Sequence, residues 1–279
     1  MSIKISLKKN LSEKNIKNYV LFSDTDFKIS GLGNLSLNKY SSAISKTIKS
    51  FKQKTETFLS FNLNPDQKII LVKINKSLSP SEIEKTGAKL YSFLKKNHIF
   101  EITFLVDNAK EFIKKNKFFL DEFLHGIHLK SYEFNKYKTK KKNFNLEISI
   151  SYKNKLLNFN SNKRFNSLVN GTNFTKDLVS EPGNILHPDE YAKRITQLRK
   201  FGLKVTVYDK KKLKKMKMNA LLGVGQGSIR GSYIVTIEWN GKKSNSKPLA
   251  FVGKGVCFDT GGISLKPAKF MEDMTYDMA

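Results

Sequence analysis

The residues best suited to chemistry lie in one glycine-rich stretch of the 279-residue chain, GKGVCFDTGGISLKP, residues 253–267. This stretch carries Lys254, Asp259 and Lys266, and Asp277 follows it closely. Glycine lets backbone and side chains approach a ligand in conformations that a β-carbon forbids. Two aspartates and two lysines on such a loop are the parts of a site for a hard metal ion with an electrophile beside it.

The two lysines suit different roles. A lysine ligates a metal only as the neutral amine, so its pKa must fall well below about 10.4, and burial beside dications lowers it. Lys254 lies between two glycines after an expected buried strand at 248–252, and it is the better candidate for a ligand. Lys266 suits a protonated lysine that stabilises charge developing on a carbonyl oxygen. Asp259 and Asp277 are carboxylates that could hold or bridge paired divalent cations.

Each of these residues alone has an ordinary explanation as part of a turn or a solvated loop. Together, GKGVCFDTGGISLKP and the following DMTYDMA closely resemble the signature region of the leucyl (cytosol) aminopeptidase family. The resemblance extends to DLVSEPGNILHPDEYA (residues 177–192) and to the stretch from Val207 through MNALLGVGQGS to Trp239. It covers roughly the last 110 residues, and motifs of this length are specific.

The resemblance implies a homohexameric enzyme that removes N-terminal residues, preferably leucine, from peptides. It implies a macro-like N-terminal α/β domain, a linker helix and an α/β catalytic domain with two divalent cations, Mn²⁺ or Zn²⁺. By position, Lys254 and Asp277 would ligate one cation, and Asp259 would bridge both. Lys266 would be the catalytic lysine that binds the scissile carbonyl oxygen. Met274 would line the pocket for the N-terminal side chain.

One part of the family's pattern does not occur in the sequence. A later NTDAEGR-like motif supplies a further metal-binding aspartate, a bridging glutamate and the catalytic arginine. Without it, Lys254, Asp259 and Asp277 are too few to hold two cations, and Glu272 and Asp273 lie in a surface-like segment that makes them poor substitutes. We therefore expect the N-terminal portion of an aminopeptidase, truncated within the catalytic domain and inactive as these 279 residues.

Alternating strand and helix patterns must position these residues, which predicts an α/β fold. A capping box at Ser79–Glu82 begins one helix. We expect strands at 19–22, 68–74, 99–106, 146–151, 203–208, 233–239 and 248–252, and helices at 80–97, 118–132, 160–178, 188–200 and 210–216. The predicted domains are a macro-like α/β domain at 1–155, a linker helix and turn at 156–185, and an incomplete catalytic domain at 186–279.

Composition narrows the class of protein. The formal net charge is +27, but only four of the 51 basic residues are arginine, whose planar fork suits phosphate and base recognition. Scattered lysines favour a solvated surface with nonspecific affinity for polyanions such as nucleic acids. No apolar run approaches the roughly 20 residues of a membrane span, and no signal peptide is recognisable. Cys257 is the only cysteine, which excludes an internal disulfide. A cytoplasmic location without membrane contact is expected.

Several alternatives remain open. Asp259-Thr260-Gly261 could be half of an aspartic protease dyad, which would need a dimer and no metal. The chain could instead be a lysine-rich nucleic-acid-binding protein or a catalytically dead remnant. His125 and His128, spaced i, i+3 on an expected helix, could bind a metal, but the sequence offers no third ligand. The glycines in residues 223–227 precede a strand, so we predict no nucleotide site there.

Overall fold

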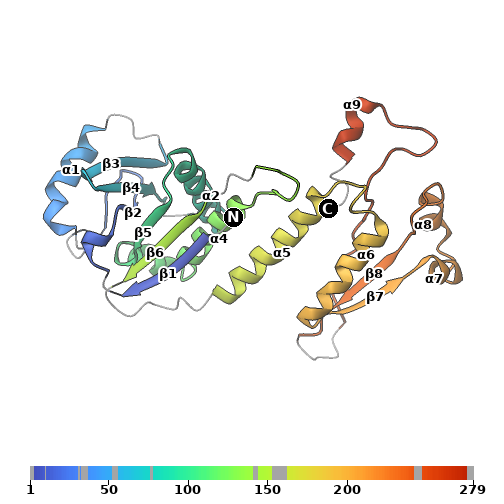
Figure 1. Ribbon diagram of the computed structural model, residues 1–279. Coiled ribbons are helices and arrows are strands. Elements are labelled where there is room, and N and C mark those ends of the chain that lie inside the picture. Colours follow the sequence, from blue (N-terminus) through green and yellow to red (C-terminus); the bar gives the residue numbers. More distant parts are fainter. Residues whose placement is uncertain are drawn as a thin grey trace. The chain divides into compact units, whose positions relative to one another are not determined.

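The computed structural model describes residues 3–9, 11–30, 32, 37–51, 56–75, 78–140, 144–152, 162–241 and 247–274. The chain divides into two compact units, Met1–Thr172 (unit 1) and Asn173–Ala279 (unit 2). The division falls inside helix α5 (Asn162–Ser180), which appears in yellow-green in Figure 1. The domain boundaries expected from the sequence stay a prediction.

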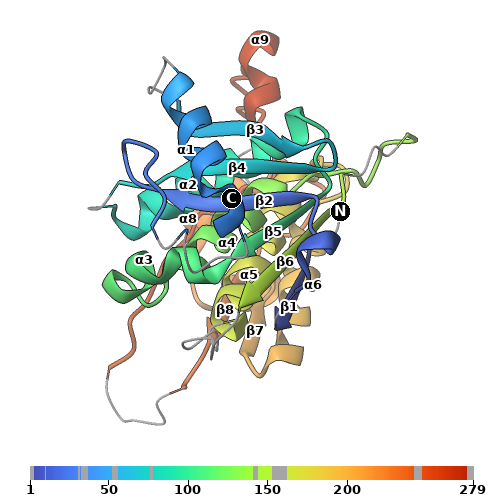
Figure 2. The ribbon, with the colours of Figure 1, turned by 90° about the vertical axis from the view of Figure 1, so that its left-hand side faces the viewer.

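Unit 1 is built on a six-stranded sheet of order β1-β6-β5-β2-β4-β3, whose strands follow one another across Figure 2. Every neighbouring pair is parallel except β3 and β4, which are antiparallel. A parallel sheet is normally covered on both faces, and this explains the continuous apolar runs of its central strands. The strands are β1 (Ile3–Lys9), β2 (Asn18–Ser23), β3 (Phe58–Asn64), β4 (Gln67–Lys73), β5 (Glu101–Leu105) and β6 (Leu146–Tyr152).

Helices cover the two faces of this sheet. On one face, α2 (Pro80–Lys96) and α4 (Phe119–Ser131) pack Leu90 and Phe123 against Phe22 and Phe104. On the other face, α1 (Ser41–Ser50) contributes the buried Ile44 to a second core. The shorter helices of unit 1 are α3 (Lys110–Lys115) and the 3₁₀ turns η1 (Glu13–Asn15), η3 (Asn38–Tyr40) and η4 (Val106–Ala109).

Two glycines let α2 and α4 cross in close contact. A β-carbon on Gly87 would lie 2.0 Å from the carbonyl oxygen of Phe123, and one on Gly126 would lie 1.9 Å from that of Glu84. The predicted capping box at the start of α2 is confirmed. Ser79 Oγ accepts from the Glu82 amide, and Glu82 Oε2 accepts from the Ser79 amide at 2.8 Å.

Unit 2 has shorter elements and a smaller core. Its two-stranded sheet pairs β7 (Lys204–Tyr208) with β8 (Ile234–Glu238) in antiparallel register. Leu178, Leu186 and Cys257 form its buried cluster, against which Phe174 and Tyr191 pack. Its helices are α6 (Pro188–Thr196), α7 (Lys210–Lys215), α8 (Asn219–Val224), α9 (Ala268–Met271) and the 3₁₀ helix η5 (Gln197–Phe201).

The predicted elements are confirmed within a few residues at their ends, with one exception. The strand expected at 248–252 is wrong, because residues 247–256 form neither strand nor helix. Leu249, Phe251 and Val252 are 81%, 88% and 100% exposed. No described strand of unit 2 pairs with this apolar run, and a strand needs a neighbour to satisfy its backbone N–H and C=O groups. None of the helices that the structure describes is long and apolar enough to span a membrane.

Candidate functional site

The glycine-rich loop brings three of the sequence-predicted site residues together. Lys266 Nζ lies 2.9 Å from Asp259 Oδ2 and 3.0 Å from Met274 Sδ. The loop is folded so that the Gly261 amide donates to Asp259 Oδ1 at 2.9 Å and the Lys266 amide donates to Thr260 O at 2.9 Å. The contacts therefore join a carboxylate, an ammonium group and a thioether at one place.

Gly261 is required for this shape. Its φ is +90°, a conformation that L side chains rarely adopt, and a β-carbon there would lie 2.3 Å from Ser264 O. The backbone thus turns back at Gly261 and returns Lys266 to Asp259. The prediction that a glycine in this loop permits a close approach of the backbone is confirmed at Gly261.

The charges around Asp259 favour its ionised form. The hydrogen bond from the Lys266 ammonium is the largest cause that holds the pKa of the Asp259 carboxyl below its usual range, followed by the Gly261 amide. Lys254 adds a smaller contribution through its positive charge. An aspartic protease dyad needs a carboxylate that shares a proton with a second one. Asp259 is instead paired with a lysine, which argues against that alternative.

The described residues supply only part of a metal site. Asp277 lies outside them, and Glu272 and Asp273 are exposed on the turn after α9. Within the described ranges, no group of three or more His, Cys, Asp or Glu side chains is arranged to hold a metal ion. Because a divalent cation takes about four to eight ligands, Asp259 and Lys254 alone do not complete a site for one cation or for two.

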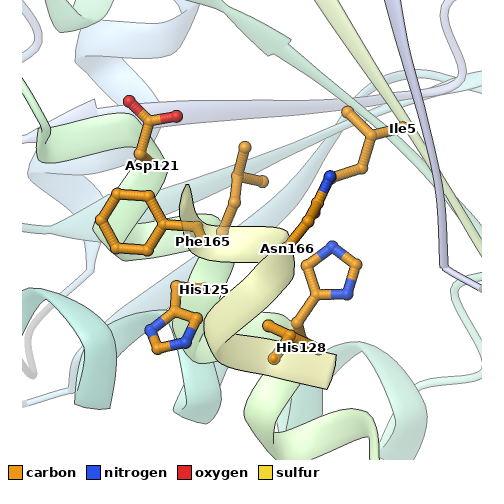
Figure 3. A pocket seen from close by; sticks show the side chains of 8 residues that line it. Ile5, Asp121, His125, His128, Phe165 and Asn166 are labelled. Atoms are coloured by element: carbon orange, nitrogen blue, oxygen red, sulfur yellow. The ribbon is translucent and has the colours of Figure 1, made fainter. Parts of the chain in front are cut away.

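The two histidines considered as ligands lie in unit 1, away from this loop in the sequence. Figure 3 shows them beside a small pocket between α4 and the first half of α5, also lined by Asp121, Phe165 and Asn166. His125 Nδ1 lies 2.9 Å from Glu84 Oε1, and burial together with the charge of His125 lowers the pKa of His128. The pocket has room for about one water molecule, at ≈ 20 Å³. A packed, partly paired histidine cluster describes these residues better than a metal centre.

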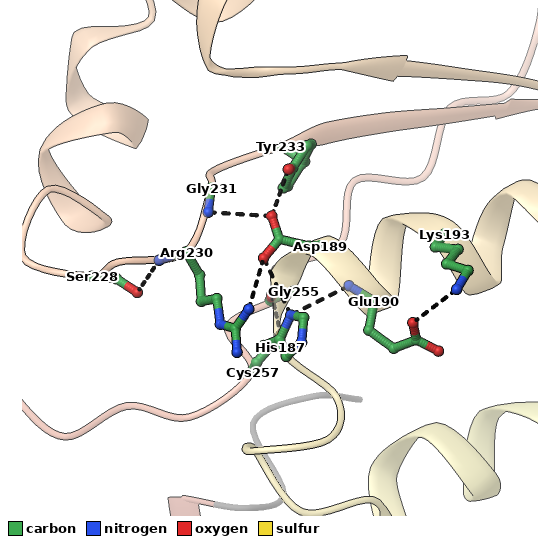
Figure 4. Close-up of polar contacts among 10 residues, drawn as sticks. All are labelled: His187, Asp189, Glu190, Lys193, Ser228, Arg230, Gly231, Tyr233, Gly255 and Cys257. Carbon is green, nitrogen blue, oxygen red and sulfur yellow. Dashed lines mark hydrogen bonds and ion pairs between the residues drawn. The ribbon is translucent and has the colours of Figure 1, made fainter.

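A polar network that the sequence did not reveal lies at the start of α6 (Figure 4). Asp189 Oδ1 accepts from Tyr233 Oη at 2.6 Å and from the Gly231 amide at 3.4 Å. Its other carboxylate oxygen lies 3.2 Å from His187 Nδ1 and 3.9 Å from Arg230 Nη1. The Tyr233 hydrogen bond is the largest cause that lowers the pKa of Asp189. The network ties the first turn of α6 to the segment that enters β8.

The proline and two acids at 188–190 indicate a helix start, but nothing in the sequence indicates a partner more than 40 residues away.

Comparisons with known proteins agree on one family. Residues 173–279, the same range as unit 2, match the catalytic domain of the cytosol aminopeptidase family. A probable cytosol aminopeptidase of Rhodopseudomonas palustris (strain BisA53) is 47% identical over 157 residues, which are 55% of this chain and 32% of that protein. One of Phytoplasma australiense is 51% identical over 156 residues, with the same shares. The matched part spans about a third of the length of these curated relatives.

Solved structures support the same fold. A mutant of tomato leucine aminopeptidase aligns with a TM-score of 0.76 and 21% identity, covering 98% of this chain and 57% of that one. Cytosol aminopeptidase from Coxiella burnetii aligns with a TM-score of 0.69 and 19% identity, covering 98% and 54%. At these identities the likeness shows the fold alone: a mixed α/β structure with a parallel sheet, as the sequence predicted.

Proposed function

We propose that the protein releases N-terminal amino acids from peptides, because residues 173–279 match the catalytic domain of the cytosol aminopeptidase family. The family match over unit 2 is the observation that carries this proposal. The pairing of Asp259 with Lys266 inside the matched range gives it a chemical basis. Leucine is the proposed preferred residue, and the proposed assembly is a cytoplasmic homohexamer.

The proposed cofactor is a pair of divalent cations, Mn²⁺ or Zn²⁺. Lys254 and Asp277 would hold one cation, and the Asp259 carboxylate would contribute to holding both. When bound, such ions polarise a carbonyl group and lower the pKa of water. Of this set, Asp259 and Lys254 lie in the described residues, and Asp277 lies outside them.

Lys266 is assigned to the scissile carbonyl oxygen. Its ammonium is held beside Asp259, and its flexible stem lets it turn toward a substrate oxygen on which negative charge develops. Met274 touches the same ammonium through its sulfur, and this contact supports its assignment to the pocket for the substrate's first residue. An unbranched thioether adapts its shape to an apolar side chain such as leucine.

The test starts with the gene. Reading the DNA downstream of codon 279, and expressing the full product, decides whether further ligands exist. We expect that product to hydrolyse a leucyl-peptide analogue, to lose activity with a chelator and to regain it with Mn²⁺ or Zn²⁺. The 279-residue chain by itself should be inactive because it holds too few ligands. Hydrolysis that a chelator does not affect, or metal-dependent hydrolysis by the 279 residues alone, would contradict the proposal.

A pair of variants of the full product tests the assigned lysine. Lys266→Gln should lower kcat about 100-fold or more, the usual effect of removing one group that stabilises an oxyanion. Lys269→Gln is the matched control, since Lys269 is exposed on α9 and its ammonium lies over the ring of Phe270. Equal losses in the two variants would remove Lys266 from its assigned role.

A further inference from the structure

A buried ion pair closes the corner between α5 and α6. Glu181 follows the last residue of α5, and only 2% of it is exposed. Its Oε1 accepts from Arg194 Nη1 at 2.8 Å, and Arg194 Nε donates to Glu190 Oε1 at 3.0 Å. One guanidinium therefore binds a carboxylate from the corner and another from α6. A buried charge is tolerated only when it is paired in this way.

The turn inside this corner is compact. The amides of Ile185 and Leu186 both donate to Pro182 O at 2.9 Å, and the Glu181 amide donates to Leu178 O at 3.2 Å. Leu186 is fully buried. The chain thus reverses within a few residues between two helices, and the Glu181–Arg194 pair spans the reversal.

Residues 255–258 rest on this corner. Cys257 is buried against Leu178 and Leu186. A β-carbon on Gly183 would lie 3.0 Å from the β-carbon of Phe258, so the turn and the loop are in direct contact. The next residue after Phe258 is Asp259, so the residues packed on the corner lead directly into the candidate site.

Tyr191 on α6 packs against the same buried cluster as Cys257. Because only 6% of Cys257 is exposed, the thiol lies in a buried contact between the loop and α6 (Figure 4).

We infer that the Glu181–Arg194 ion pair is a positioning element for Asp259. The pair holds the α5–α6 corner closed, and the closed corner seats residues 255–258, which fix where the Asp259 carboxylate emerges. Arginine suits this task because its rigid fork reaches two carboxylates at once, which a lysine ammonium does less well. The consequence for catalysis rests on the proposed function, whereas the seating of the loop does not.

The reactivity of the Cys257 thiol shows whether residues 255–258 are packed on the corner, because Cys257 is the only cysteine in the chain. The rate of its reaction with an aromatic disulfide reagent at pH 8 is measured in the 279-residue chain and in three variants. We expect Glu181→Gln to raise the rate about tenfold or more, because the thiol must be uncovered to react. Arg194→Lys should raise it less. Arg199→Lys is the control, since Arg199 donates to Val205 O away from the corner, and it should leave the rate unchanged.

Low concentrations of urea separate local opening from global unfolding. If residues 255–258 come off the corner locally, the rate of Cys257 labelling should depend little on the urea concentration. If unit 2 is only less stable, that rate should rise steeply with urea. If Glu181→Gln does not fold, the double variant Glu181→Met/Arg194→Met leaves no unpaired buried charge and should fold. A folded variant with unchanged labelling, or a rate that follows global unfolding, would overturn the inference.

Kinetics of the full gene product test the consequence for catalysis. Arg194→Lys should lower kcat about tenfold or more with a small change in KM, because a misplaced Asp259 impairs the reaction more than the binding of a peptide. Faster Cys257 labelling in the variants, found together with a wild-type full product that has no peptidase activity, would refute the proposed function and leave the seating of residues 255–258 supported. An active wild type with normal kcat in Arg194→Lys would refute the positioning role alone.

Discussion

Units 1 and 2 differ in how completely their apolar side chains are covered. In unit 1, helices cover both faces of the sheet, and all fully buried aromatic side chains of the described residues lie there, among them Phe22, Phe104 and Phe123. In unit 2, the buried cluster consists of Leu178, Leu186 and Cys257. Several of its large apolar side chains are exposed, among them Trp239, Phe251, Val252 and Ile263.

The family match falls on the unit with the smaller core. Residues 173–279 match the catalytic domain, yet this unit has a two-stranded sheet and few buried residues. The family match and the larger buried core therefore fall on different units. We expect unit 1 to supply most of the free energy of unfolding, because that energy scales with the apolar area removed from water.

The largest predicted effect compares one phenylalanine from each unit. Phe123→Ala removes a fully buried ring from the α4 core, and about 3–5 kcal/mol of unfolding free energy should be lost. Phe251→Ala removes a ring that is almost entirely exposed, and it should change stability by less than about 0.5 kcal/mol. Urea denaturation monitored by circular dichroism measures both. Similar losses in the two variants would mean that the units are equally well packed.

The next effect concerns two glycines of unit 1. Gly126→Ala places a methyl group 1.9 Å from the carbonyl oxygen of Glu84, so α2 and α4 must separate, at a cost of about 3 kcal/mol. Gly171→Ala is the matched control in α5, where a β-carbon meets nothing within 4 Å. Because alanine favours a helix by about 1 kcal/mol over glycine, the control should gain stability. Tolerance of Gly126→Ala in thermal unfolding would rule out the close crossing.

Most of the α/β framework follows from local patterns. The capping box at Ser79 and the apolar runs of β2, β4 and β5 depend on neighbours in the sequence, and these elements were predicted. β1 was missed, because its alternation of isoleucine with lysine resembles a solvated segment until β6 pairs with it. Residues 248–252 show the reverse case: the run is as apolar as a buried strand, but it has no partner strand among the described residues.

In the candidate site, too, the features set by neighbours in the sequence could be predicted, and those set by distant partners could not. The loop from Gly253 to Lys266 could be recognised because its residues are close in sequence, and the glycine at the tightest turn, Gly261, is visible in the motif. The partners of Asp189 and the pairing of Glu181 with Arg194 depend on how helices and loops meet in space. Their residue types are common, so only the fold distinguishes them. The ligand roles of Lys254, Asp259 and Asp277 stay a prediction.

A smaller effect tests the polar network of unit 2. Tyr233→Phe removes the 2.6 Å hydrogen bond to Asp189. Since 36% of the Asp189 side chain is exposed, water replaces part of the lost interaction, and about 1 kcal/mol of stability should be lost. The pKa of Asp189 should rise toward its usual range, because this hydrogen bond is the main cause of its lowering. Tyr208→Phe, on the paired strand β7, is the control and should leave that pKa unchanged.

The smallest predicted effect is a change in the pKa of one carboxyl group. Asp259 has a lowered pKa in the folded chain, so its ionised form contributes stability above the ordinary aspartate pKa, and this contribution is lost as pH falls through the folded value. Lys266→Gln removes the leading cause, so the pKa should rise. It should stay partly lowered, because the Gly261 amide and the Lys254 charge remain.

An NMR titration of the Asp259 side-chain carboxyl carbon measures this shift, with Lys269→Gln as the control. The acid sensitivity of the folded loop should move to higher pH in Lys266→Gln. The midpoint of global unfolding by urea at pH 7 should barely change, because both side chains are more than 30% exposed and such pairs contribute little. If the pKa of Asp259 stays low without Lys266, the backbone amide and Lys254 suffice to hold its charge. Asp259 would then be ready to bind a cation whether or not Lys266 is present, and the two residues would act independently.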